Sequence, residues 1–584
     1  MLITALHNAI LDVILLGTMY LRTTTANTKA DGQIEYLQLC QNYYDKESKR
    51  SKTQVIYNFG RKKDADLGAI RQLMVTLGKF ITAQTGEFFP ALDSLPEQSL
   101  FLESHALGGT WVLDQLWNRL GIAKALKTVL NNRSYDIPLE RLIFSMVANR
   151  ALAPSSKLYL EHWVANEVYI EGLPSVDSQN LYRAMDFLQE HAQELQKAVF
   201  HSVADLFNLE VDLLFIDTTT TYFETEGEDG DYSELDNEGK ELVHLGYRKR
   251  SKHGKDNHPE LPQVVICFAV TRNGIPIKCW SWPGNTSDKA IIAEIKNDLN
   301  QWDLGRSIFV EDTGFNSEKN RRILRGAGSH YIIGEKMRLG RNADAHAALG
   351  QKGKYTTLEN GLEIKDMLFD ADSVTCRRFI LIRNPEEAKR DKLKRDDIVA
   401  EAERRIEALK QEKQEQHSKK TCALRSHEVF GKYIKQSKTG VLSIDRAKIR
   451  KEEHFDGKYL ISTSDLKLSA EDVVMGYKQL AAIERVFRDL KHLIDIRPVF
   501  HRKEDRIRSH VLLCWLALLM IRVAEQETKM TWFQMKKIFN SLHLGTLKTP
   551  HGTIRQSSEL TVEMKSLFTT LKLDKPNKVL QIAM

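Results

Sequence analysis

The stretch Leu213-Leu214-Phe215-Ile216-Asp217-Thr218-Thr219-Thr220-Thr221 decides the fold of this chain. Four consecutive apolar residues that end at a charged side chain are typical of a strand buried on both faces. Two further apolar runs follow at 264–270 and 275–282, and helical spacing is expected over 288–302. The apolar run Ser307 to Val310 completes a β-β-β-α-β order. The prediction is an α/β fold, α+β overall, with a mixed sheet flanked by helices.

The composition is that of a folded globular protein with more than one domain. At 584 residues the chain is longer than one hydrophobic core supports, which predicts two to four domains. Hydrophobic residues make up 42% and charged residues 28%, so a disordered or fibrous protein is excluded. The six cysteines contain no CxxC pair, which indicates neither a zinc site nor a disulfide framework and favours the cytoplasm. No segment reaches the roughly 20 apolar residues of a membrane span, so no membrane partner is expected.

Changes of periodicity divide the chain into six regions after a short leader. Residues 1–18 are interpreted as a non-native leader, because Met19-Tyr20-Leu21-Arg22 begins the polar, strand-like sequence. The expected regions are a β-hairpin region at 19–62, a helical domain at 63–208, the first part of the α/β core at 209–337, an insertion with strands and a charged helix at 338–462, the final part of the core at 463–530 and a C-terminal region at 531–584.

Two aspartates follow buried-strand runs. Asp217 comes directly after Leu213–Ile216, and Asp312 comes after Ile308-Phe309-Val310-Glu311. Both are expected at the carboxyl ends of strands, where open α/β sheets place their sites. A buried charge there needs a partner or a metal ion, although either aspartate alone also suits a capping or turn position. Glu311 is expected to point to the opposite face of its strand, which favours Asp312 as the ligand.

A third acid lies on a later helix. The capping box Ser469-Ala470-Glu471-Asp472 predicts a long helix that runs to about Leu493. Tyr477, Glu484 and Lys491 are seven residues apart, so one stripe of that helix presents a phenol, a carboxylate and an ammonium. Arg488 follows Glu484 by four residues, so a simple surface salt bridge is the alternative interpretation.

Taken together, the three acids predict a site for two divalent cations. Asp217, Asp312 and Glu484 supply only oxygen ligands, which suit Mg²⁺ or Mn²⁺. Two such ions, roughly 3.5 to 4 Å apart, support in-line attack on a phosphodiester. One ion lowers the pKa of water or of a 3′-hydroxyl, and the other stabilises the leaving oxygen.

These residues resemble a known family, the DDE transposases of bacterial insertion sequences, in the branch called the IS-four group. Asp217 in Ile-Asp-Thr-Thr is similar to the first aspartate of the family, Asp312 in Glu-Asp-Thr-Gly to the second, and Glu484 to the final glutamate. Of the Tyr-Arg-Glu-Lys signature of this branch, Tyr477, Glu484 and Lys491 match, and Leu480 stands in the place of the arginine. Three further segments are similar to one subgroup, namely Ser251 to Asp256, Pro283 to Asp288 and Arg497 to His501.

The resemblance implies a ribonuclease-H-like catalytic core and metal-dependent DNA cleavage followed by strand transfer. It also implies that the hairpin and helical regions bind terminal inverted repeats, that target DNA is a second partner, and that a homodimer forms the synaptic complex. Such a protein is expected in the cytoplasm, associated with the nucleoid.

Basic residues are expected to hold the DNA backbone, which gives affinity that depends on salt and not on sequence. Tyr477, Arg488 and Lys491 are expected to position phosphates near the cut. A basic loop before the second strand is expected to add Arg248, Lys249, Arg250, Lys252 and Lys255. The alternative is an ordinary solvated loop. The acidic run from Glu224 to Glu238, just upstream, is expected to be disordered surface.

Two rival functions stay open. A metal-dependent nuclease would cut DNA without joining strands. A catalytically silent, repeat-binding protein derived from a transposase would bind DNA only, and its expected mark is the loss of one acid, whereas all three are present here.

Overall fold

The structure is a computed structural model, and it divides the chain into two compact units. One unit contains Met1–Ser202 and Leu519–Met584, and the other contains Val203–Leu518. The structure describes residues 19–583 apart from 29–31, 46–49, 67, 69, 71–72, 74–75, 78–99, 131–136, 174, 208–210, 226, 236–240, 245, 252–253, 256–257, 303, 305–306, 339–342, 370–376, 411–413, 498 and 550–551.

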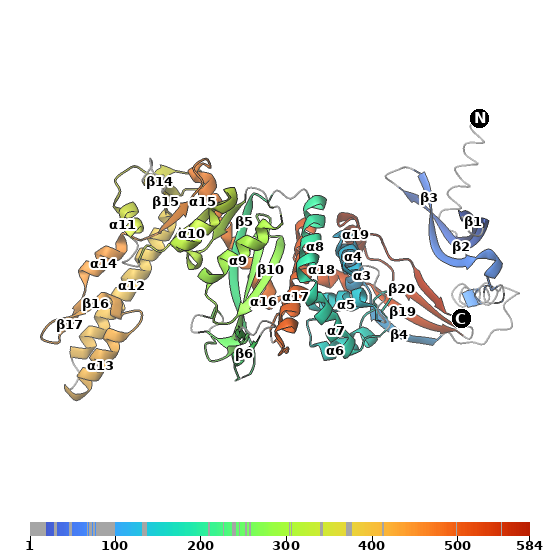
Figure 1. The fold of residues 1–584 in the computed structure, drawn as a ribbon, viewed down its shortest axis with the longest axis horizontal. Coiled ribbons are helices and arrows are strands. Elements are labelled where there is room, and N and C mark those ends of the chain that lie inside the picture. The colour runs from blue at the N-terminus through green and yellow to red at the C-terminus, as the bar shows by residue number, and fades with distance from the viewer. Residues whose placement is uncertain are drawn as a thin grey trace. The chain divides into compact units, whose positions relative to one another are not determined.

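The unit 203–518 is built on a ten-stranded mixed sheet (Figure 1). In spatial order its strands are β10 (Pro276–Pro283), β9 (Pro262–Thr271), β5 (Leu213–Tyr222), β11 (Ile308–Glu311), β12 (His330–Glu335), β18 (Lys458–Thr463), β15 (Arg377–Arg383), β14 (Glu363–Phe369) and β13 (Thr356–Thr357), with β8 (Lys249–Arg250) paired to β9. β11 is parallel to both β5 and β12, and the other described pairs are antiparallel. This confirms the predicted β-β-β-α-β order and the ribonuclease-H-like fold class.

The two faces of this sheet are covered by different helices. On one face lie α15 (Ala470–Lys478) and α16 (Leu480–His492), because Phe487 packs against Phe268 of β9 with 5.5 Å between ring centroids. On the other face lie α9 (Asp288–Asn300) and α10 (Glu318–Leu324), because the ammonium of Lys296 stands 4.4 Å from the ring centroid of Phe309. Successive residues of a strand therefore point to different helix layers, which decides which acids can meet.

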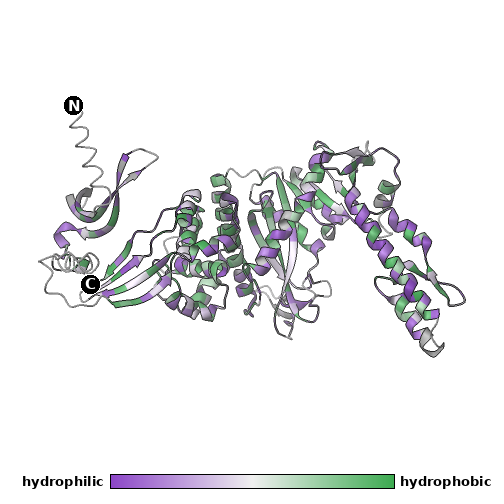
Figure 2. Ribbon diagram, turned by 180° about the vertical axis from the view of Figure 1, so that it is seen from behind, coloured by the Kyte–Doolittle hydropathy of each residue, from purple (hydrophilic) through white to green (hydrophobic). Residues whose placement is uncertain are grey.

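The segment predicted to be an insertion contributes to the same sheet. Strands are present in it as predicted, and β14, β15 and β18 extend the sheet beyond β12. Other elements of this segment are α11 (Ala343–Gly350), α12 (Pro385–Lys410), α13 (Gln414–Ser426), β16 (Ile434–Gln436), β17 (Leu442–Ile444) and α14 (Arg446–Glu453). Figure 2 shows that α12 and α13 are largely hydrophilic, as predicted for the charged helix. Apolar residues of α12, such as Ala402 and Ile406, are buried against residues of this same segment, such as Leu424 and Leu442.

The prediction of one unbroken helix from Ser469 to Leu493 is wrong at Gln479. The N–H of Gln479 is shared between the carbonyl oxygens of Met475 and Gly476, each at 3.2 Å, so the last turn of α15 tightens before α16 begins at Leu480. Gly476 is a weak helix former at this end. Tyr477 therefore lies on α15, while Glu484 and Lys491 lie on α16, the helix that follows the break.

The other unit contains the predicted helices and the N-terminal hairpin. β2 (Gly32–Asp45) pairs antiparallel with β3 (Arg50–Arg61), as predicted for the hairpin region, and β1 (Met19–Thr28) adds a third strand. The residues between β2 and β3 lie outside the described part of the chain. The helices described in this unit include α3 (Gly108–Arg119), α4 (Ile122–Leu130), α5 (Leu139–Leu152), α6 (Lys157–Asn166), α7 (Ser178–Glu190), most of α8 (Ala192–Phe207), α18 (Trp532–Phe539) and α19 (Val562–Thr570). A four-stranded sheet holds β4 (Leu100–Ala106), β19 (His543–Thr549), β20 (Gly552–Ser557) and β21 (Val579–Ala583).

The helix α17 (Glu504–Thr528) is the most apolar long helix among the described residues. By length and composition alone it is long enough to cross a membrane, but 89% of its most apolar 18-residue window is buried inside the protein. Residues such as Trp515 and Met520 are fully buried. Burial of this kind is what a core helix requires.

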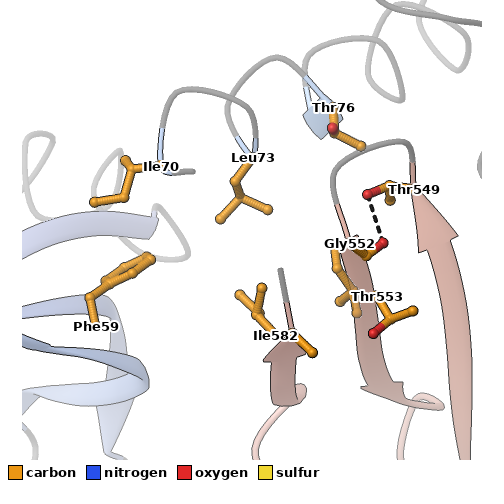
Figure 3. Close-up of a pocket in the computed structure, with 10 residues that line it drawn as sticks. Phe59, Ile70, Leu73, Thr76, Thr549, Gly552, Thr553 and Ile582 are labelled. Carbon is orange, nitrogen blue, oxygen red and sulfur yellow. Dashed lines mark hydrogen bonds between the residues drawn. The ribbon is translucent and has the colours of Figure 1, made fainter. Parts of the chain in front are cut away.

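A small apolar pocket lies in the unit that holds the hairpin (Figure 3). Its lining includes Phe59, Leu73 and Ile582, and Thr549 Oγ1 donates a 3.0 Å hydrogen bond to the carbonyl oxygen of Gly552 at its rim. Because no titratable side chain lines this pocket among the described residues, it offers no group for acid–base or metal chemistry.

Lys296→Met is expected to stabilise the protein at neutral pH. Lys296 is only 3% exposed, it contacts Ser329 Oγ, and burial lowers the pKa of its ammonium to about 8. Because the folded pKa lies below the unfolded value, the penalty is fully present below about pH 8 and disappears as the pH rises toward 10.5. We expect a gain on the order of 1–3 kcal/mol in the free energy of unfolding at pH 7.

Urea unfolding at pH 7 and at pH 10 measures this effect, and the gain should be much smaller at pH 10. The matched control is Lys289→Met, since Lys289 is an exposed lysine on the same helix. An equal gain at both pH values would contradict the assignment of the penalty to the buried charge.

Candidate active site

The structure brings Asp217 and Asp312 together on two adjoining parallel strands. Ile216 of β5 is paired with Glu311 of β11, so the next residue on each strand, Asp217 and Asp312, comes at the same level. Ile216 and Glu311, the residues before them, point to the face covered by α9. Because successive side chains point to opposite faces, Asp217 and Asp312 belong to the face covered by α15 and α16. Burial raises the pKa of Asp217, and the nearby charge of Asp312 raises it further.

The predicted position of Asp217 at the end of its strand needs a correction. β5 continues through Thr218–Thr221 to Tyr222, because these β-branched residues pair with β9. What ends after Ile216 is the pairing with β11, whose last residue is Glu311. Asp312 does follow the end of its strand, as predicted, and precedes the short helical turn Thr313–Phe315. The carboxylate of Asp217 therefore lies where β5 loses one neighbour.

Lys255 contacts Asp217 directly. Its Nζ lies 3.1 Å from Asp217 Oδ1 and also donates to the carbonyl oxygen of Thr218 at 2.6 Å and to Thr218 Oγ1 at 2.9 Å. Burial by itself would lower the pKa of Lys255, but the carboxylates of Asp217, Asp288 and Asp312 outweigh burial and raise the pKa. The sequence interpretation placed Lys255 in a DNA-binding loop, and the structure places its ammonium against the first aspartate.

Tyr477 reaches the second aspartate. Its hydroxyl donates a hydrogen bond to Asp312, and burial followed by the charge of Asp312 raises the pKa of this phenol. Room for the hydroxyl comes from Gly334 of β12, where a Cβ atom would lie only 3.1 Å from Tyr477 Cζ and still closer to the hydroxyl oxygen. The phenol is thus fixed between a glycine and a carboxylate.

Glu484, Arg488 and Lys491 lie on α16. Glu484 and Arg488 are exposed and Lys491 is half-buried. Within the part of the chain that the structure describes, no three His, Cys, Asp or Glu side chains are close enough together to hold a metal ion. Asp217 and Asp312 lie at the same level of adjoining strands, but Glu484 does not complete a ligand set with them in this conformation.

Asp288 is a further acid of this region that the analysis of the sequence did not single out as a site residue. Its Oδ1 accepts a 2.7 Å hydrogen bond from Thr218 Oγ1, and its Oδ2 would lie 2.9 Å from a Cβ atom added to Gly314. Asp288 is the first residue of α9, on the opposite face of the sheet from Asp217. From there it reaches Thr218, the residue after Asp217, and Gly314, two residues after Asp312. Its place at the end of the segment Pro283 to Asp288, which was similar to one subgroup, was the available signal.

Glu311 is buried on the same side of the sheet as Asp288. It is fully buried, and neither carboxylate oxygen has a hydrogen-bond partner among the described residues. Burial, assisted by the charge of Asp288, raises the pKa of Glu311 to about 8. The pairing of Glu311 with Ile216 confirms the prediction that Glu311 points to the opposite face from Asp312.

The basic loop and the acidic run contact each other. Arg248 Nε donates to both carboxylate oxygens of Asp229 at 2.9 and 3.1 Å, and Lys249 Nζ lies 2.7 Å from Asp231 Oδ1. Arg250 Nε donates to the carbonyl oxygen of Glu260 at 2.8 Å. Although burial opposes it, the hydrogen bonds and charge of Arg248 lower the pKa of Asp229.

The acidic run was expected to be disordered, and for its described part this is wrong. The strands β6 (Tyr232–Leu235) and β7 (Glu241–His244) form a hairpin, and the acids before it pair with the basic loop because opposite charges meet there. Lys252 lies outside the described residues. DNA contact by the other basic residues of the loop stays a prediction.

Comparisons with known proteins agree with this geometry. The family model described as Transposase DDE domain matches residues 212–520, and the model described as IS1634 family transposase, N-terminal domain matches residues 21–85. No curated protein matches the chain.

Two solved transposase structures show a distant likeness. The piggyBac transposase synaptic complex with hairpin DNA is 7% identical, with a TM-score of 0.33 over 74% of this chain and 79% of that chain. The Mos1 mariner paired end complex with Mn is 11% identical, with a TM-score of 0.14 over 46% of this chain and 77% of that chain. Because the Transposase DDE domain model covers more than half of the chain, and spans both Asp217 and Asp312, this protein belongs to the DDE transposase family.

Proposed function

We propose that this DDE transposase is a member of the IS-four group that binds the terminal inverted repeats of an insertion sequence, cleaves DNA there and joins the ends to target DNA. The observation that carries the proposal is the pair Asp217 and Asp312, which come at the same level of two adjoining parallel strands, close enough for the charge of Asp312 to raise the pKa of Asp217. Glu484 is proposed as the third acid, from α16. The match of an insertion-sequence transposase N-terminal domain to residues 21–85 supports a repeat-binding role for that end of the chain.

The residues of the site fit a divalent metal. Asp217 and Asp312 offer carboxylate oxygens, which are the ligands that Mg²⁺ and Mn²⁺ prefer. The ammonium of Lys255 lies against Asp217 and Thr218, and this contact supports a cation position here. We propose that Asp217, Asp312 and Glu484 hold two such ions. When bound, the ions would activate water or a 3′-hydroxyl and stabilise the leaving oxygen.

The residues around the acids have separate roles in this proposal. Tyr477 orients the carboxylate of Asp312 by donating a hydrogen bond to it. Asp288 fixes Thr218, the residue after Asp217, through the hydroxyl of that threonine. Arg488, Lys491 and the basic loop are proposed to hold the DNA backbone. Cutting two ends in concert requires two active sites, so a homodimer is proposed for the synaptic complex, in the cytoplasm and on the nucleoid.

Incubation of the full chain with DNA ends tests this function. The substrates are a labelled duplex that carries the terminal sequence flanking the gene, and a pre-cut end of that duplex mixed with a target plasmid, each with Mg²⁺ or Mn²⁺. We expect cleavage at the repeat boundary and plasmid joined to the labelled end. Cleavage without joined product would show a nuclease instead. Binding without cleavage would show the silent repeat-binding protein. Two observations favour this alternative: Leu480 stands in the arginine place, and among the described residues Glu484 does not complete a three-acid group.

A further inference from the structure

We propose that the ammonium of Lys255 fills the cation position at Asp217 in the metal-free protein, and that a divalent ion binds there only by displacing it. This inference rests on the proposed function, because it assigns metal binding to Asp217. It makes Lys255 a positioning residue that sets the metal affinity of the site.

The contacts of Lys255 resemble those of a bound cation. An ammonium has three N–H donors, and here three oxygens receive them, namely Asp217 Oδ1, the carbonyl oxygen of Thr218 and Thr218 Oγ1. A carboxylate, a carbonyl and a hydroxyl are also the oxygen types that coordinate hard divalent cations. One position is therefore built for a cation, and the lysine occupies it.

The charges favour exchange of the lysine for a divalent ion. The carboxylates of Asp217, Asp288 and Asp312 all act on the ammonium of Lys255. A single positive charge leaves part of this negative charge unbalanced, whereas a divalent ion balances more of it. Both cations cannot share Asp217 Oδ1, because two positive charges about 3 Å apart repel each other strongly in a half-buried site. Metal binding at this oxygen therefore requires Lys255 to leave.

Lys255 is placed so that it can leave without unfolding its segment. Its side chain is 42% exposed, while that of Asp217 is 21% exposed. Its backbone N–H donates a 3.0 Å hydrogen bond to Thr220 Oγ1, which anchors the main chain beside β5 independently of the ammonium. Rotation of the side chain alone brings the ammonium into water.

Lys255→Met tests the proposal, because methionine keeps the length of the side chain and removes its charge. Binding of Mn²⁺ to the full chain is measured without DNA, from the electron paramagnetic resonance signal of the free ion at constant pH and salt. We expect the dissociation constant of the variant to fall at least about tenfold, which corresponds to about 1.4 kcal/mol. Lys249→Met is the matched control, because it removes a lysine that pairs with Asp231 instead, and its constant should stay within about twofold.

Thermal unfolding gives a second readout that separates competition from a general change of charge. Without metal, Lys255→Met should unfold at a lower temperature than the unchanged protein, because Asp217 loses its partner. Saturating Mn²⁺ should raise the unfolding temperature of the variant more than that of the unchanged protein. If the methionine variant does not fold, Lys255→Gln is measured in the same way.

An unchanged or weaker affinity for Mn²⁺ in the folded variant would overturn the inference. So would an equal gain in the Lys249→Met control, since the effect would then be unspecific. The proposed function fails on other results: tighter Mn²⁺ binding without strand transfer would refute that function and leave this inference standing. Strand transfer with unchanged Mn²⁺ affinity would refute this inference alone.

Discussion

Asp217→Asn and Asp312→Asn are each expected to reduce cleavage of a terminal-repeat duplex by well over about 100-fold, the upper loss seen when only an outer partner of a metal ligand is removed. Asparagine keeps the shape of each side chain but removes the negative charge that would hold the ion. The two aspartates come at the same level of adjoining strands, and the charge of Asp312 raises the pKa of Asp217. Loss of either carboxylate should therefore abolish metal binding by the pair. The measurement is the initial rate of cleavage with Mg²⁺ and with Mn²⁺, together with the affinity for uncut DNA.

Binding of DNA should survive both substitutions within about threefold, because neutral side chains at this position repel phosphates less than carboxylates do. The matched control is Asp212→Asn. Asp212 directly precedes β5 and carries an exposed ion pair with Arg272 at 2.9 Å, so its replacement should leave the rate almost unchanged. A variant of Asp217 or Asp312 that cuts at the normal rate would show that this ligand is wrongly placed.

Gly334→Ala is expected to lower the rate of cleavage by about 10- to 100-fold, the range for outer-shell partners of metal ligands. The added methyl group would meet Tyr477 Cζ at 3.1 Å and Thr313 Cγ2 at 2.8 Å, with the phenol oxygen closer still. Tyr477 must therefore move away, and Asp312 loses the hydrogen bond of the hydroxyl. The change should appear in the turnover rate, since DNA binding does not depend on this contact.

Gly326→Ala is the control for Gly334→Ala, because a Cβ atom at Gly326 meets no atom within 4 Å. A double-mutant cycle with Tyr477→Phe decides the mechanism. If Gly334 acts through the hydroxyl of Tyr477, the glycine substitution should cost much less in the phenylalanine background. If the rate losses of the two single variants multiply in the double variant, the alanine damages the site by another route.

The sequence predicted the centre of the fold well. The apolar runs at β5, β9, β10 and β11 are buried strands, because a strand covered on both faces needs apolar residues at every position. The acids that end such runs are visible for the same reason, since a charge inside a buried strand is rare. Asp217 and Asp312 could therefore be chosen before their contact was known.

The helix break shows where local pattern misleads. A seven-residue spacing places Tyr477 and Glu484 on one stripe only if the helix is continuous. α15 ends at Gln479, whose N–H is shared between two carbonyl oxygens. The spacing of the apolar residues does not predict this break. Tyr477 reaches Asp312, whereas Glu484 stays exposed on α16.

The sequence by itself thus determined which strands form the core and which two acids follow their apolar runs, because burial leaves a local pattern of apolar residues. Only the tertiary structure decided what surrounds those acids. Lys255 meets Asp217 across 38 positions of sequence, and Asp288 meets Thr218 across 70. Gly334 makes room for a tyrosine from another element, and Asp229 pairs with Arg248. Such contacts depend on how distant segments pack, and a charged or small residue looks the same in the sequence whether its partner is water or another side chain.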